Sequence, residues 1–246
     1  MTDAASRYLR GLIPPPGPVS LSEKQLFGSL DATYAAVGAS LAKSPDRWGG
    51  WKLGGSNHAS RKAFGVSELY YGALAHEEIL TNPDHAPCAD LYEVKGEVEI
   101  ALRIAPDGQG YDAWCVALEM PSSPIANLLE CGVRALVADR CAAGVLLLGP
   151  VSTGALPPLD QAVLTLEQDA ETLDSAGLGS LTAPPEQQLK DFLDLSRAHG
   201  VKTRPGDWVA TGGITRCCDF SAGARVRVLL DGAVQLDVEI TRGPGT

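Results

Sequence analysis

Two glutamates interrupt an apolar run that otherwise has the character of a buried strand, and this run limits how the chain can fold. In the stretch E-V-E-I, Glu97 and Glu99 alternate with Val98 and Ile100. Successive side chains of a strand point to opposite faces, so the two glutamates share one face. Like charges at this spacing raise each other's pKa. The fold must therefore supply something that offsets their repulsion.

The order of expected elements is one helix, then mostly strands with two inserted helices. The first helix is expected to open at the S-x-x-E capping box Ser20–Glu23 and to close at Pro45. A second is expected from Ser123–Pro124, and a third from Pro185 to Gly200. Strands are expected at 50–55, 97–104, 111–120, 144–150 and 162–169, with a hairpin over 224–240 that turns at Asp231-Gly232. This order lacks regular βαβ alternation and indicates an α+β fold.

Charge and composition exclude several classes of partner. The chain has 246 residues, is 45% hydrophobic and carries a formal net charge of −10, which disfavours both nucleic acids and anionic membranes. Residues 1–18 break at three prolines and are not expected to form a signal peptide, and no apolar run reaches transmembrane length. The six cysteines form no C-x-x-C pair, so we expect reduced thiols in a cytoplasmic protein.

A third carboxylate can join the first two. Glu119 lies at the end of the strand expected at 111–120, which can pair with the strand at 97–104. An oxygen-rich pocket of three carboxylates suits Mg²⁺ or Mn²⁺. The E-x-E spacing alone is also typical of a solvated strand face, so the spacing leaves both interpretations open.

Six short motifs in register resemble the fumarylacetoacetate hydrolase superfamily, and within it the branch of 2-oxopent-4-enoate hydratases and 4-oxalocrotonate decarboxylases. The resemblance covers residues 20–242, through the motifs WKLGG, YYGAL, GEVEIAL, ALEM, VADRCAAGVLLLG and PGDWVATGGIT. It implies a mixed β-roll of the superfamily's C-terminal type, here a catalytic domain over 51–246, preceded by a helical segment over 1–50.

The resemblance also implies roles for individual residues. Glu97, Glu99 and Glu119 match the superfamily's metal ligands, and the cofactor would be Mg²⁺ or Mn²⁺. Lys52 matches its active-site lysine, for which a lowered pKa would favour proton transfer. Glycines of the motif TGGIT, Gly213 among them, would offer backbone N–H groups to the substrate, and Thr215 a hydroxyl.

Some positions depart from the superfamily's pattern. Tyr70 stands where an acidic residue is common, and Asp139-Arg140-Cys141-Ala142 replaces a pattern that carries Asn and Ser. Tyr70 is kept as a substrate-binding candidate. Arg140 either points inward, where it would bind a second carboxylate of the substrate, or is a surface arginine. His58 either serves as an acid–base residue or is a solvated loop histidine.

The sequence is compatible with three functions. The first is a metal-dependent lyase, of hydratase or decarboxylase type, that acts on a 2-oxo or 2-hydroxydienoate acid through a metal-stabilised enolate. The second is a C–C bond hydrolase for acylpyruvates, with His58 activating water. The third is a diverged subunit or a repurposed relative. The protein is expected to form a homo-oligomer or a complex with a related enzyme.

Overall fold

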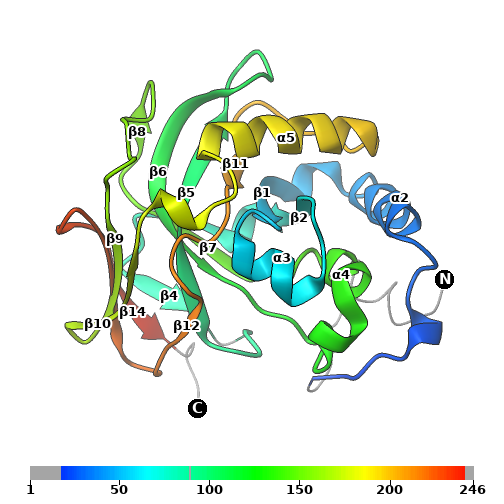
Figure 1. Ribbon diagram of the computed structural model, residues 1–246, viewed down its shortest axis with the longest axis horizontal. Coiled ribbons are helices and arrows are strands. Elements are labelled where there is room, and N and C mark those ends of the chain that lie inside the picture. The colour runs from blue at the N-terminus through cyan, green and yellow to red at the C-terminus, as the bar shows by residue number, and fades with distance from the viewer. Residues whose placement is uncertain (1–17, 89, 242–246) are drawn as a thin grey trace.

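The computed structural model describes residues 18–88 and 90–241, which fold around two sheets with helices on one side (Figure 1). The larger sheet is mixed and curled, and its main strands run in the order β2-β1-β11-β5-β6-β7-β3. It consists of β1 (Trp48–Gly54), β2 (Tyr70–Ala75), β3 (Ile79–Thr81), β5 (Lys95–Ile104), β6 (Tyr111–Met120), β7 (Val145–Leu148), β8 (Ser152–Thr153), β11 (Trp208–Ala210) and β12 (Cys218–Asp219).

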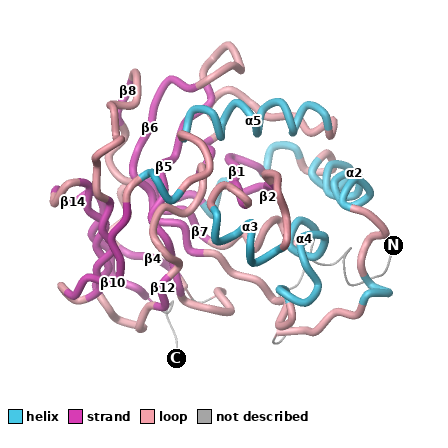
Figure 2. The backbone as a smooth tube through the Cα atoms, viewed as in Figure 1, coloured by secondary structure: helices cyan, strands magenta, loops and turns pink. Residues whose placement is uncertain are grey.

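The second sheet has the order β10-β9-β13-β14-β4 and lies at the end of the molecule away from the helices (Figure 2). Its strands are β4 (His85–Pro87), β9 (Leu164–Gln168), β10 (Glu171–Ala176), β13 (Arg225–Leu230) and β14 (Ala233–Thr241). The helices are α2 (Leu30–Leu41), α3 (His58–Phe64), α4 (Leu128–Ala138) and α5 (Pro185–Ala198), with short 3₁₀ turns at Glu23–Gln25, Pro45–Arg47, His76–Glu78 and Leu178–Ser180. The α+β class expected from the sequence is confirmed.

The predicted start of the first helix is wrong. The capping box that forms is Ser22–Gln25 rather than Ser20–Glu23, and it opens only the 3₁₀ turn Glu23–Gln25; the Gln25 side chain accepts from the backbone N–H of Ser22 at 2.9 Å. The α-helix begins at Leu30, because the Ser29 hydroxyl accepts from the backbone N–H of Ala32 at 3.1 Å and caps the helix there.

The second helix also begins later than predicted. α4 opens at Leu128 rather than at Ser123–Pro124; the Ser123 hydroxyl donates to the Asp139 carboxylate at 2.6 Å and accepts from the backbone N–H of Ile125 at 3.1 Å, which closes a turn before the helix. Gly132, with φ 71° and ψ −168°, interrupts the helical geometry inside α4. Residues 123–127, which were predicted to begin the helix, therefore form a loop before α4.

The remaining predictions for the second half of the chain are confirmed. α5 begins at Pro185 and is followed by Gly200 in the left-handed region at φ 68°. The β13–β14 hairpin turns at Asp231 and Gly232, whose φ values of 49° and 80° are those of a tight hairpin turn. All six cysteines are free thiols, and no helix of the described residues is long and apolar enough to cross a membrane.

An aromatic cluster joins α2 and α5 to the first two strands. Tyr34 stacks on Tyr71 with ring centroids 4.8 Å apart, and Phe192 packs on Trp51 and Tyr71 at 5.5 Å and 5.2 Å. The indole N–H of Trp51 donates to Asp207 at 2.9 Å. The cluster fixes β1, which also carries Lys52. The expected boundary between segments 1–50 and 51–246 stays a prediction, and residues 1–17 with the expected absence of a signal peptide lie outside the described residues.

Replacement of Phe192 by alanine should test how strongly this cluster holds the fold. The variant should lose about 3–5 kcal/mol of unfolding free energy, because it leaves a cavity in the core. Urea denaturation followed by tryptophan fluorescence measures the change. The matched control on the same helix is Lys190→Ala, which removes only an exposed ion pair with Asp194 and should cost at most about 0.5 kcal/mol. Equal losses in the two variants would contradict the proposed importance of the cluster.

Candidate metal centre and active site

The antiparallel pairing of β5 and β6 brings three carboxylates together. In this register Glu97 lies opposite Glu119, and Glu99 lies opposite Ala117. One carboxylate oxygen from each of Glu97, Glu99 and Glu119 lies within 4.8 Å of the others. The acidic cluster that the sequence predicts from the strand pattern is therefore present in the structure.

The burial of these groups fits a bound cation. Glu99 is fully buried, and its Oε2 accepts from the backbone N–H of Gly212 at 2.7 Å. Its Oε1 and the buried Oε2 of Glu119 accept no hydrogen bond from the described residues. Buried carboxylate oxygens without donors are costly unless a cation balances them. Three carboxylates, two of which carry such oxygens, are a suitable ligand set for a hard divalent ion such as Mg²⁺ or Mn²⁺.

Burial and mutual repulsion raise the pKa values of two of these acids. The pKa of Glu97 is raised to about 7, chiefly by burial and then by the charge of Glu119. The pKa of Glu99 is raised well above its ordinary value by burial and by both neighbouring carboxylates. The repulsion expected from the E-x-E spacing is thus part of the folded structure.

Lys52 supplies the cation nearest to the cluster. It is buried on β1, between β2 and β11, and its ammonium forms an ion pair with Glu119. Burial, the largest single effect, lowers the pKa of Lys52, but the charge and hydrogen bond of Glu119 together with the nearby Cys141 and Glu97 outweigh it, so the net shift is upward. This direction is opposite to the lowering expected from the sequence.

The loop after β11 closes the site with two glycines. A Cβ on Gly213 would lie 2.1 Å from Glu97 Oε2, so only glycine fits beside that carboxylate. The Gly213 carbonyl accepts from the Asn57 side chain at 2.9 Å, which ties the start of α3 to the loop. The Thr215 hydroxyl accepts from the backbone N–H of Val98 at 2.9 Å. Thr215 therefore holds the loop against β5.

The three carboxylates lie beside one large cavity of about 1190 Å³. Among the candidates, Lys52, Tyr70, Glu97, Glu119, Gly213 and Thr215 line it. Tyr70 is buried opposite Gly54 in the β1–β2 pair, and burial raises the pKa of its phenol. The structure thus brings most of the predicted site residues to one place, from five separate segments of the chain.

Two candidates lie away from the cavity. His58 is the first residue of α3, is exposed and does not line the cavity, although its neighbours Asn57 and Ala59 do. The Arg140 guanidinium forms a two-pronged ion pair with Glu78, at 2.7 Å and 2.8 Å. Arg140 also donates to the Ala73 carbonyl at 3.1 Å. The inward-pointing alternative for Arg140 is therefore not what the structure has.

Sequence reasoning missed a hydroxyl–carboxylate pair on the cavity wall. Ser123 lines the cavity, and its hydroxyl donates to Asp139 at 2.6 Å. Burial raises the pKa of Asp139 to about 7, against the lowering effects of Ser123 and Arg140. The two residues are sixteen positions apart, so no local pattern in the sequence could reveal their contact.

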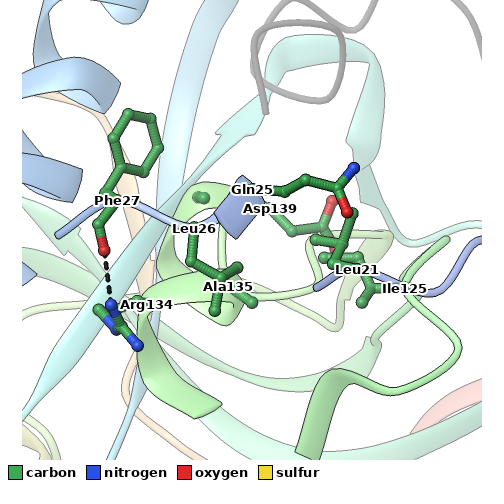
Figure 3. Close-up of a pocket in the computed structure, with 9 residues that line it drawn as sticks. Leu21, Gln25, Leu26, Phe27, Ile125, Arg134, Ala135 and Asp139 are labelled. Carbon is green, nitrogen blue, oxygen red and sulfur yellow. Dashed lines mark hydrogen bonds between the residues drawn. The ribbon is translucent and has the colours of Figure 1, made fainter. Parts of the chain in front are cut away.

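A segment from the N-terminal part of the chain covers the other side of Asp139. Figure 3 shows a small pocket where Leu21, Gln25 and Leu26 lie over α4 and Asp139. Arg134 fastens this segment by donating to the Phe27 carbonyl at 2.7 Å. Asp139 is thus enclosed between this segment and the wall of the large cavity.

Comparison with solved structures identifies the fold. 4-Oxalocrotonate decarboxylase from Pseudomonas putida G7, complexed with magnesium and adipate, has a TM-score of 0.83 at 16% identity over 96% of each chain. Fumarylpyruvate hydrolase from Pseudomonas aeruginosa, in complex with Mn²⁺ and pyruvate, has a TM-score of 0.58 at 16% identity, over 94% of this chain and 99% of the other.

A putative fumarylacetoacetate isomerase/hydrolase from Oleispira antarctica has a TM-score of 0.54 at 16% identity, over 78% of this chain and 93% of the other. No family model matches the chain. The chain therefore has the fold of the fumarylacetoacetate hydrolase superfamily, and the resemblance seen in its motifs is confirmed at the level of the fold.

The raised pKa of Asp139 predicts how stability depends on pH. Its folded pKa of about 7 exceeds the ordinary value of an aspartate, so the folded state binds this proton more tightly than the unfolded state. The wild type should therefore lose stability relative to Asp139→Asn as pH rises from 5 to 8. Asparagine keeps the acceptor oxygen for Ser123. Urea midpoints at the two pH values measure the effect, and an identical pH response in both proteins would contradict it.

Proposed function

We propose that the protein is a metal-dependent lyase, of decarboxylase or hydratase type, that acts on a 2-oxo or 2-hydroxydienoate acid. The observation that carries the proposal is the cluster of Glu97, Glu99 and Glu119 beside Lys52 at the cavity. The decarboxylase and the hydrolase of the same fold, with their magnesium and Mn²⁺, support it. We propose further that the protein is cytoplasmic and acts as a homo-oligomer or with a related enzyme.

Glu97, Glu99 and Glu119 would hold Mg²⁺ or Mn²⁺. Such an ion supplies Lewis-acid chemistry, which stabilises negative charge on the oxygens of a 2-oxo acid. The buried Lys52 ammonium shares Glu119 with that site and faces the same cavity. It stays protonated, so it can bind the substrate's carboxylate and give a proton to the developing enolate.

Other residues would orient the substrate and handle protons. The Tyr70 phenol and the Ser123 hydroxyl both face the cavity, and Ser123 is held by Asp139. A hydroxyl that donates to a carboxylate can accept a proton from the substrate and pass its own proton on. Gly213 lines the cavity beside Glu97, where a backbone without a side chain would lie next to the bound substrate.

The alternative function is hydrolysis of a C–C bond in an acylpyruvate. The similarity in fold to fumarylpyruvate hydrolase favours it. Hydrolysis needs a base that activates water, and the candidate His58 is exposed and outside the cavity lining. We therefore rank the lyase first and the hydrolase second. The third alternative is a diverged subunit or a repurposed relative. An activity assay of the protein on lyase substrates would distinguish it from the first alternative.

Calorimetric titration with Mg²⁺ and Mn²⁺ tests the metal site. The wild type should bind one ion, and Glu99→Gln should weaken binding by at least about tenfold, because it removes a charged ligand. The matched control is Glu93→Gln, since Glu93 also lines the cavity but pairs with Lys95. Absence of binding in the wild type, or equal weakening in both variants, would end the metal proposal.

Replacement of Lys52 by methionine tests the role of the lysine. Turnover of 2-hydroxydienoate substrates should fall by on the order of 10²-fold, because a positioned proton donor is removed. Binding of Mg²⁺ should persist, since Glu119 loses its competing partner. Lys95→Met serves as the control, because Lys95 lines the same cavity and should affect turnover little. Unchanged turnover in Lys52→Met would refute the assignment.

A further inference from the structure

One wall of the cavity is apolar and is built by two helices. Ala63 and Phe64 contribute to it from α3, Leu128 and Leu129 from the start of α4, and Ile125 from the loop just before α4. Leu129 is 65% exposed, more than any other large hydrophobic side chain of the described residues. Together with its neighbours on this wall, Leu129 offers an apolar surface that a hydrocarbon part of a ligand could contact.

The cations of these two helices all lie off the cavity wall. Arg61 donates to the Gly55 carbonyl at 2.6 Å, and Lys62 is exposed outside the lining. Arg134 donates to the Phe27 carbonyl, and Arg140, directly after α4, is committed to Glu78. No basic side chain of α3 or α4 is therefore available to a ligand that lies between them.

The cations that do line the cavity belong to its other parts, and each has a carboxylate partner. Lys52 pairs with Glu119 at the metal ligands and Lys95 pairs with Glu93. Arg216 pairs with Asp174 at 3.3 Å, near β10 and β12. Glu130 adds a negative charge beside Leu129. The polar side chains on this wall already donate elsewhere: Ser60 to the Asn57 carbonyl, Ser123 to Asp139 and Asn127 to the Leu21 carbonyl. A second carboxylate on the substrate would therefore meet apolar surface, donors already in use and this negative charge between α3 and α4.

We propose that the end of the substrate remote from its 2-oxo acid group is an uncharged hydrocarbon chain or ring that lies between α3 and the start of α4. This inference rests on the proposed function, because the metal cluster and Lys52 must bind the 2-oxo acid end. It sets this chain apart from the structural neighbour that holds the dicarboxylate adipate. The specificity-determining residues are Phe64, Leu128 and Leu129.

The physical basis is the difference between burying methylenes and burying a charge. Each buried methylene favours binding by about fourfold in affinity. A carboxylate buried without a cation or a donor costs far more than that gain. The wall should therefore select ligands by the distal group while the metal end binds all of them alike.

The test uses direct binding of unreactive ligands to the Mg²⁺-loaded full chain by calorimetry. Oxalate probes the metal end alone. 2-Oxohexanoate and 2-oxoadipate have the same number of carbons and differ in whether a second carboxylate is present. We expect 2-oxohexanoate to bind at least about tenfold more tightly than 2-oxoadipate, and about fourfold more tightly than its homologue with one methylene less.

A charged variant tests where the distal group lies. Leu129→Arg should reduce the preference for 2-oxohexanoate by at least about tenfold, because it supplies a cation on the wall. The matched control is Val163→Arg at an apolar position that is 46% exposed and outside the cavity lining. It should leave the preference unchanged. Circular dichroism spectra of both variants establish that they fold.

The outcomes separate the two proposals. If oxalate does not bind the Mg²⁺-loaded wild type, the proposed function fails and this inference fails with it. If oxalate binds but 2-oxoadipate binds as tightly as 2-oxohexanoate or more tightly, only the inference is overturned. If the wild type prefers 2-oxohexanoate but Leu129→Arg keeps that preference in full, the placement between α3 and α4 is overturned.

Discussion

The confinement of three carboxylates by the β5–β6 register is the constraint on which the rest of the site depends. Glu97 faces Glu119 across the pair, and Glu99 follows on the same face, so their repulsion is fixed by backbone hydrogen bonds. Folding offsets it only in part, through the Lys52 ion pair and the Gly212 N–H. The oxygens that remain without donors are chemically suited to a cation.

Neighbouring elements are arranged around that constraint. β1 must lie close enough for Lys52 to reach Glu119, and the aromatic cluster of Trp51, Tyr71 and Phe192 holds β1 against α5. The loop after β11 must pass beside Glu97, which excludes any side chain at Gly213. The sheets and helices thus enclose a charged site within an apolar core. The free energy gained by packing that core holds the charged side chains together.

The two ends of the cavity differ in chemistry, and this difference connects the fold to specificity. The charged side chains of one end come from β1, β5 and β6, whereas α3 and the start of α4 present apolar side chains at the other. Arg140 illustrates how this arises. Its guanidinium forms an ion pair with Glu78, which lies 62 residues earlier in the chain, so Arg140 places no cation between α3 and the start of α4.

The sequence by itself determined the α+β class, the strand that carries Glu97 and Glu99, the hairpin at Asp231-Gly232 and helix α5, because these follow from local periodicity and turn chemistry. Its motifs also pointed to Glu119 and Lys52. Only the tertiary structure decided where α2 and α4 begin, that Ser123 binds Asp139, and that Arg140 and His58 lie off the cavity. Those outcomes depend on residues that are distant in the sequence. A local pattern cannot predict which distant residue will bind a given hydroxyl or guanidinium.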